Sequence, residues 1–233
     1  MTETGAFEAS PVLAVDGPGG AGKGTLCAAI AAAYGWHLLD SGAIYRLLGL
    51  KVRQTGTDIA NEVDVAALAR QLDIRFEPSS ASGLVSTSLD GVDVSSVIRT
   101  ETAGTDASLV AAMPSVRDAL LQRQRDFRKS PGLVADGRDM GTVVFMDAQL
   151  KIFLTASVEE RAQRRHKQLI QQGVDANLAR LSAEIAERDR RDTERSSAPL
   201  KPATDAVMVD TSEMTIADVV GHVMQRMVAQ GLA

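Results

Sequence analysis

The stretch from Val12 to Thr25 constrains this chain more than any other part of its sequence. An apolar segment, Val12 to Val15, runs into GPGGAGKGT and then into a helix-forming segment that ends near Tyr34. This order predicts a phosphate-binding loop, because the glycines let successive backbone amides point at phosphate oxygens. The helix that follows adds the positive end of its dipole. The alternative is a glycine-rich turn before an ordinary helix, and the apolar strand and helix on either side make that interpretation weaker.

Two side chains of this loop carry specific predicted roles. Lys23 would reach the outer phosphates, and the hydroxyl of Thr25 would face Mg²⁺. The usual pattern places Ser or Thr directly after the lysine, but here Gly24 stands there and the hydroxyl follows one residue later. The predicted phosphate-binding residues are Gly17, Pro18, Gly19, Gly20, Ala21, Gly22, Lys23, Gly24 and Thr25.

Length and composition limit the remaining possibilities. A chain of 233 residues with 45% hydrophobic residues can form one large α/β domain, with or without an insertion, or two small domains. A net charge of −5 argues against a protein that coats nucleic acid. Cys27 is the only cysteine, so no internal disulfide can form and a reducing, cytoplasmic location is expected. The acidic first ten residues do not resemble a signal peptide, and no apolar run predicts a membrane span.

Short apolar segments alternate with helical ones along most of the chain. Further strands are predicted at 36–39, 133–135, 151–155 and 206–209, and helices at about 42–54, 157–172, 177–190 and 215–228. Short buried strands separated by helices predict a parallel sheet covered on both faces.

Residues 73–96 interrupt this alternation. Strand candidates at 73–77, 84–89 and 92–95 are separated by turn signals at 78–82 and at Asp90-Gly91. This pattern predicts a small antiparallel sheet inserted into the α/β domain. Two helical stretches follow; the first holds Ser108, and the second begins near Pro114 and carries Arg117. For most arginines of the second stretch (Arg117, Arg123, Arg125 and Arg128), a solvated helix face is the simpler interpretation.

Two polar clusters directly follow predicted strands. Ligands of parallel sheets bind beyond the carboxyl ends of the strands, so Ser41 and Arg46 would face the same crevice as the glycine-rich loop. A capping serine and a surface arginine are the alternative. In the second cluster, Ala135-Asp-Gly-Arg-Asp-Met-Gly141, Asp136 could hold the hydration shell of Mg²⁺ and Arg138 could bridge phosphates.

Two further clusters lie on predicted helices. The segment 161–167 carries several cations, although Glu159 and Glu160 could compensate them on a solvated face. In the segment 187–195, Arg188, Asp192 and Arg195 share one face if the helix continues. That stripe suits a ligand with hydroxyls and phosphate, whereas an internal ion-pair ladder is the alternative.

The segments GPGGAGKGT, LLDSGAIYR, ADGRDMGTVVF, KIFLTAS and ERDRRDTER, in this order, resemble those of the bacterial cytidylate kinases, a branch of the nucleoside monophosphate kinases. Gly24-Thr25 is the form that kinases acting on monophosphates often carry. The resemblance implies an α/β fold of the P-loop NTPase type, a parallel β-sheet flanked by helices. It also implies a core at 1–72 and 97–233, a short helical lid at about 161–175, and a monophosphate-binding antiparallel sheet at 73–96 with flanking helices to about 129.

The resemblance also implies a role for each matching side chain. It places the ATP phosphates on residues 17–25 and Mg²⁺ near Thr25 and Asp136, directly or through water. Acceptor-binding roles fall to Ser41, Arg46 and Arg138 near the phosphate, to Ser108, Arg117 and Asp139 at cytosine, to Arg188 and Asp192 at the ribose hydroxyls, and to Arg195 on the phosphate side. The implied catalytic residues are Lys23, Arg138, Arg188 and Arg195. Gly19 and Met146 depart from the common serine and proline of this family, but neither change removes a group that the mechanism needs.

The implied reaction transfers the γ-phosphoryl group of ATP to CMP or dCMP. Its loose transition state calls for alignment and positive charge rather than a strong base. A kinase for another small acceptor, such as UMP, is the nearer alternative. A nucleotide-dependent switch is the more distant one, and the sequence lacks the Asn-Lys-x-Asp motif of guanine-reading GTPases. The expected partners are ATP and CMP or dCMP, with no nucleic acid or membrane, and a monomer is expected.

Overall fold

The computed structural model describes residues 10–78, 85–171 and 173–232. Its centre is a five-stranded sheet in the order β2-β6-β1-β7-β8, and each neighbouring pair is parallel. The strands are β1 (Val12–Asp16), β2 (His37–Asp40), β6 (Leu133–Asp136), β7 (Leu150–Thr155) and β8 (Val207–Asp210). The predicted α/β class with a parallel sheet is confirmed.

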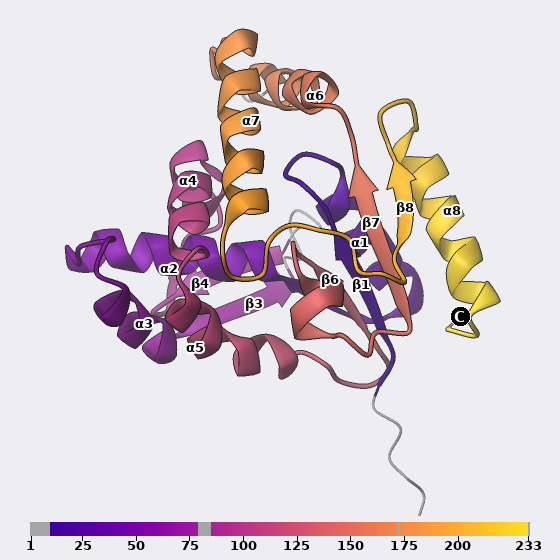
Figure 1. The fold of residues 1–233 in the computed structure, drawn as a ribbon, viewed down its shortest axis with the longest axis horizontal. Coiled ribbons are helices and arrows are strands. Elements are labelled where there is room, and N and C mark those ends of the chain that lie inside the picture. Colours follow the sequence, from indigo (N-terminus) through magenta and orange to yellow (C-terminus); the bar gives the residue numbers. More distant parts are fainter. Residues whose placement is uncertain (1–9, 79–84, 172, 233) are drawn as a thin grey trace, which may run out of the picture.

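Helices cover both faces of this sheet (Figure 1). On one side lie α1 (Lys23–Tyr34) and α8 (Ile216–Ala229); on the other lie α2 (Ser41–Thr55), α3 (Glu62–Gln71), α4 (Glu101–Val110) and α5 (Pro114–Arg125). Alternate residues of β1 serve the two cores: Val12 packs with the α2–α5 cluster and Leu13 with the α1–α8 cluster. None of the described helices is both long enough and apolar enough to cross a membrane.

Two helices, α6 (Val158–Gln171) and α7 (Leu178–Glu194), pack against each other beyond the carboxyl ends of the strands (Figure 1). The sequence predicts the end of α7 near residue 190, but the helix continues to Glu194. This extension places Arg188 and Asp192 in one continuous helix, with Arg195 as its C-terminal cap.

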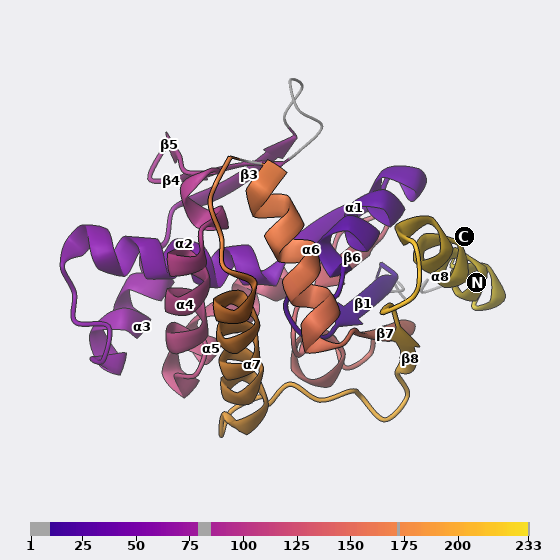
Figure 2. The same ribbon diagram turned by 90° about the horizontal axis from the view of Figure 1, so that it is seen from above.

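The predicted antiparallel sheet is confirmed. It consists of β3 (Ile74–Pro78), β4 (Val85–Leu89) and β5 (Val92–Asp93), in that order. Asp90 and Gly91 both have positive φ, of 51° and 79°, as a two-residue hairpin turn requires. Residues 79–82 of the other predicted turn, and the predicted strand start at Leu84, lie outside the described residues. Figure 2 shows the small sheet beside α2, on the side of the molecule away from α8.

Three short helical elements of the described residues were not predicted, one of them a 3₁₀ turn at Val97–Arg99. Helix α3 begins at an Asn61 cap, whose side chain accepts the N–H of Asp64 at 3.3 Å, and it buries only small residues such as Val65 and Ala69. A π-helical turn, Met140–Val144, follows β6 and a short loop. Helix α5 also ends at Arg125, four residues before the predicted end at 129. Short runs of small side chains carry a weak periodic signal, which explains why the sequence pattern did not indicate α3.

Candidate functional site

The glycine-rich loop leaves β1 in a direction that only glycine allows. Gly17 has φ of 144°, and a Cβ there would lie 2.2 Å from the carbonyl oxygen of Leu154. The loop ends where α1 begins at Lys23, a side chain only 6% exposed. The Nζ of Lys23 donates to the carbonyl oxygen of Pro18 at 2.9 Å and lies 3.8 Å from Oδ1 of Asp136. The loop therefore carries a buried ammonium group beside a carboxylate at the end of a neighbouring strand.

Acidic side chains end three adjacent strands at this edge of the sheet. Asp16 ends β1, and the strand register pairs Asp40 of β2 with Asp136 of β6. Burial raises the pKa of Asp136 and Lys23 lowers it, with burial the larger effect. Burial and then Arg138 lower the pKa of Lys23. Each group of this pair is therefore costly to keep charged, and the nearby opposite charge offsets that cost.

The surroundings of Asp136 suit a magnesium ion that keeps most of its water. A Cβ on Gly24 would lie 3.6 Å from Oδ2 of Asp136, so this carboxylate faces the first turn of α1, which also carries the exposed Thr25. Among the described residues, no group of three or more His, Cys, Asp or Glu side chains could hold a metal ion. Mg²⁺ commonly binds through one or two protein oxygens together with substrate phosphates and water. This donor set fits that mode of binding.

A small cavity of about 50 Å³ lies beside the loop. Side chains from α2, α4, α5, α7 and the segment after β6 surround it. All the predicted substrate-binding residues except Arg46 line it, namely Ser41, Ser108, Arg117, Arg138, Asp139, Arg188, Asp192 and Arg195. The fold thus brings together residues that lie far apart in the sequence.

The two buried carboxylates of this cavity each have partners within the protein. Asp139 forms an ion pair with Arg117. Asp192 accepts hydrogen bonds from Nε of Arg138 at 3.0 Å and from the hydroxyl of Ser108 at 3.2 Å. Burial raises the pKa of Asp139 despite its arginine neighbours, whereas for Asp192 the arginines outweigh burial and lower the pKa. Asp192 is therefore firmly ionised at neutral pH.

The cations of the cavity are less well satisfied than its carboxylates. Nε of Arg188 and Nη2 of Arg195 are buried and, among the described residues, have no hydrogen-bond partner. The Arg195 nitrogen lies 3.9 Å from Oδ1 of Asp139, too far for a hydrogen bond. Burial, followed by the charges of Arg138 and Arg46, lowers the pKa of Arg188 to about 10. Unpaired buried donors and mutually repelling cations are the environment that an anionic ligand would satisfy.

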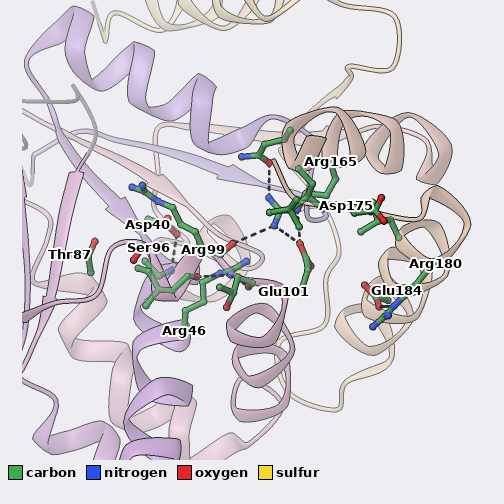
Figure 3. Close-up of a pocket in the computed structure, with 18 of the residues that line it drawn as sticks. Asp40, Arg46, Thr87, Ser96, Arg99, Glu101, Arg165, Asp175, Arg180 and Glu184 are labelled. Atoms are coloured by element: carbon green, nitrogen blue, oxygen red, sulfur yellow. Dashed lines mark hydrogen bonds and ion pairs between the residues drawn. The ribbon is translucent and has the colours of Figure 1, made fainter. Parts of the chain in front are cut away.

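Arg46, the one predicted substrate-binding residue that does not line this cavity, lines a larger cleft of about 1240 Å³. The cleft opens between the small sheet and helices α6 and α7, and Figure 3 shows Arg46 on one of its walls. Nη1 of Arg46 donates to the carbonyl oxygen of Ile98 at 2.8 Å. A Cβ on Gly104 would lie 3.2 Å from Nη1 of Arg188 and 3.3 Å from Nη2 of Arg46. This glycine therefore lets two guanidinium groups, from α2 and α7, approach the same point.

Helices α6 and α7 are tied to the glycine-rich loop by Arg161, which lies in the predicted lid but was not among the predicted site residues. This buried side chain donates to the carbonyl oxygen of Gly19 at 3.0 Å and forms an ion pair with Asp189 of α7. A second arginine of α6, Arg165, forms an ion pair with Glu101 of α4 at 2.6 Å (Figure 3). Two cations of the cluster at 161–167, Arg161 and Arg165, therefore form ion pairs with other helices rather than lying on a solvated face.

A third cavity, of about 570 Å³, lies on the other side of the loop. Its lining includes Gly22 and Thr25 of the loop, Arg164 of α6, and the segment after β8. Nη2 of Arg164 donates to the carbonyl oxygen of Thr211 at 2.6 Å, and the Thr211 hydroxyl donates to the carbonyl oxygen of Ala21 at 3.1 Å. The sequence interpretation missed this segment, although it follows the carboxyl end of a parallel strand, where ligands bind.

Helix α5 also contributes more than the solvated face predicted for most of its arginines. Gln124 is almost fully buried and accepts a hydrogen bond from the hydroxyl of Ser41 at 2.6 Å. Nε of Arg125 donates to the carbonyl oxygen of Val144 at 3.1 Å. Arg128, beyond the end of α5, donates to the carbonyl oxygen of Ser10 at 2.6 Å. For these two arginines the solvated interpretation is wrong, because both bind backbone carbonyl groups.

Comparison with known proteins gives a consistent result. The family model described as "Cytidylate kinase" matches residues 13–229. The cytidylate kinase of Pseudomonas aeruginosa (strain PAO1) is 55% identical over 223 residues, covering 96% of this chain and 97% of the relative. That of Pseudomonas putida (strain W619) is 53% identical over 223 residues, covering 96% and 98%. Among solved structures, shikimate kinase from Acinetobacter baumannii in complex with shikimate aligns with 97% of this chain and 98% of its own, at 15% identity and a TM-score of 0.45.

Proposed function

Because this chain belongs to the cytidylate kinase family, we propose that it transfers the γ-phosphoryl group of ATP to CMP or dCMP, giving ADP and CDP or dCDP. The observation that carries this proposal is the cavity beside the glycine-rich loop. Among the described residues, one buried guanidinium nitrogen each of Arg188 and Arg195 has no hydrogen-bond partner there. Donor phosphates on the loop and an anionic acceptor in this cavity would lie side by side.

The acceptor nucleotide would be read by different parts of the cavity. Asp139, held by Arg117, offers a carboxylate oxygen to the exocyclic amine of cytosine, with Ser108 nearby on α4. Uracil carries a carbonyl group at that position, so it would leave the buried acceptor unpaired. Asp192 and Arg188 would hold the ribose hydroxyls. The acceptor phosphate would lie toward Arg46, Arg138 and Arg195, with the Ser41 hydroxyl close by.

The donor would occupy the other side of the loop. Backbone amides of residues 17–25 and the ammonium group of Lys23 would hold the phosphates of ATP, and the cavity beside Arg164 and Thr211 would receive its base. Thr25 and Asp136 would hold Mg²⁺, in part through water. When bound, this ion supplies positive charge to the phosphate oxygens.

Phosphoryl transfer needs positive charge around the reacting oxygens rather than a strong base. The acceptor phosphate is already an oxyanion near neutral pH. Lys23, Arg138 and Arg188 would stabilise the charge that spreads over the transferring group, with Arg195 on the acceptor side. Arg161 joins Gly19 of the loop to α7 through Asp189. Closure of α6 and α7 as a lid would keep this contact to the loop and exclude water from the donor phosphates.

A coupled assay of ADP release tests the proposal. ATP and Mg²⁺ are supplied with CMP, dCMP, UMP or AMP, and a reaction without acceptor measures hydrolysis of ATP by water. We expect rapid release with CMP and dCMP, much slower release with UMP and AMP, and almost none without acceptor. Comparable rates with UMP and CMP would refute the acceptor assignment. Slow GTP hydrolysis with no CMP-dependent ADP release would refute a kinase altogether.

A further inference from the structure

We propose that Asp16 is a positioning residue that fixes the Arg138-Asp139 pair relative to the phosphate-binding loop. Asp16 is the last residue of β1, directly before the loop, and it was not among the predicted site residues. The inference rests on the proposed function, because it assigns Arg138 and Asp139 to the bound acceptor.

Asp16 holds the turn after β6 through both of its carboxylate oxygens. The side chain is 4% exposed; Oδ1 accepts the N–H of Met140 and Oδ2 accepts the N–H of Gly141, each at 2.8 Å. Just before Arg138, the N–H of Gly137 donates to the carbonyl oxygen of Val15 at 3.0 Å. Arg138 and Asp139 therefore lie between two attachments to neighbouring residues of β1.

The attachment has little freedom to move. A Cβ on Gly141 would lie 3.0 Å from Cδ of Lys151 and 3.4 Å from Oδ2 of Asp16, so Gly141 is packed between these two side chains. On the other side, Asp16 is bonded to Gly17, whose backbone lies against Leu154 too closely for any side chain. A shift of the Asp16 carboxylate would therefore move the acceptor-binding turn relative to the donor-binding loop.

The negative charge of Asp16 is what makes both contacts possible. Although burial raises its pKa to about 6, the carboxylate is ionised above that value and offers an acceptor on each oxygen. Hydrogen bonds to an ionised acceptor are the stronger kind. An asparagine of the same shape has one acceptor oxygen and one amide nitrogen. It would place its own N–H groups against a backbone N–H and lose one attachment.

The test is the steady-state kinetics of Asp16→Asn at a pH well above 6, with CMP, UMP and ATP each varied in turn. Losing a charge-assisted hydrogen bond that orients Asp139 should raise KM for CMP about tenfold, while KM for ATP changes by less than about threefold. The preference for CMP over UMP should fall by a similar factor, and kcat should decrease because Arg138 moves as well. Gly141→Ala, whose added Cβ would meet the stem of Lys151 at 3.0 Å and so displace the turn that Asp16 holds, should show the same pattern with the charge of Asp16 retained.

A matched control separates positioning from simple loss of stability. Val223→Ala removes buried methyl groups from α8, in the core on the opposite face of the sheet, and should lower the melting temperature with both KM values unchanged. If Asp16→Asn and Gly141→Ala behave like Val223→Ala, losing only folded enzyme, the inference is wrong. If Asp16→Asn does not fold, Gly141→Ala decides the question alone. A wild-type enzyme that fails to phosphorylate CMP would instead refute the proposed function, and the inference with it.

Discussion

Replacing Arg188 by methionine should stabilise the free protein, although most substitutions of buried side chains destabilise. The pKa of this guanidinium group is lowered to about 10 by burial and by the nearby charges of Arg138 and Arg46. A basic group whose pKa falls on folding makes the folded state less stable while it is charged. The cost is fully present below about pH 10 and declines only as the pH rises beyond that value.

The size of this effect follows from the pKa. At ~1.4 kcal/mol for each tenfold change, the depression corresponds to about 3 kcal/mol. Attraction to Asp192 is lost in the variant, and partial exposure of Arg188 screens its charge, so a net gain of about 1 to 2 kcal/mol is expected. In a chain of this length, that gain raises the melting temperature by roughly 2 to 6 °C. Methionine retains the apolar stem, so the packing of α7 should change little.

Calorimetric melting with and without CMP measures both consequences. The Arg188 variant should melt above wild type without nucleotide. CMP should raise the melting temperature of wild type but not of this variant, and kcat/KM of the variant should fall about a hundredfold or more. Arg190→Met is the matched control on the same helix. That exposed side chain pairs with Glu187 at 2.9 Å and Glu194 at 2.6 Å, so no stabilisation is expected. A variant at Arg188 that melts at or below the control would refute the reasoning.

Three further predictions test other parts of the molecule. Lys23→Met should lower kcat about a hundredfold or more with the fold intact, as shown by coupled kinetics and circular dichroism. Arg138 and the other nearby arginines outweigh burial and hold the pKa of Asp192 below its usual value. The stabilising contribution of this carboxylate is therefore lost in acid. In urea unfolding below about pH 4, the stability of wild type should fall more steeply than that of Asp192→Asn. Gly132→Ala should cost roughly 1 to 3 kcal/mol in urea unfolding with kcat unchanged, because the added Cβ would lie 2.4 Å from the ring of Trp36.

The features that the sequence predicts best are those encoded over a few neighbouring residues. The phosphate-binding loop needs a strand, glycines and a lysine within about a dozen positions, and the strands of the sheet are short apolar runs with clear ends. The hairpin at Asp90-Gly91 depends on two residues that tolerate positive φ. Each of these signals is local, so tertiary contacts had little opportunity to override it.

The features that the sequence did not reveal depend on contacts between distant residues. The carboxylate of Asp16 meets amides more than 120 positions away, at Met140 and Gly141. Thr211, which follows β8, meets Ala21 of the loop after β1 because both strands flank β7 in the same sheet. An aspartate at a strand end or a threonine in a loop has many possible partners. No pattern of residue types therefore distinguishes these from ordinary polar positions.

The size of the acceptor cavity limits how the proposed substrate can bind. Pockets for molecules of this kind usually measure about 300 to 1000 Å³, whereas this cavity measures about 50 Å³. Its carboxylates already bind Arg117, Arg138 and Ser108, so a nucleotide has to replace or share these contacts. Only a ligand that supplies both an anion for the arginines and donors for the carboxylates can do so without leaving buried charges unpaired. A nucleoside monophosphate with an exocyclic amine and ribose hydroxyls meets both conditions, whereas inorganic phosphate meets only the first.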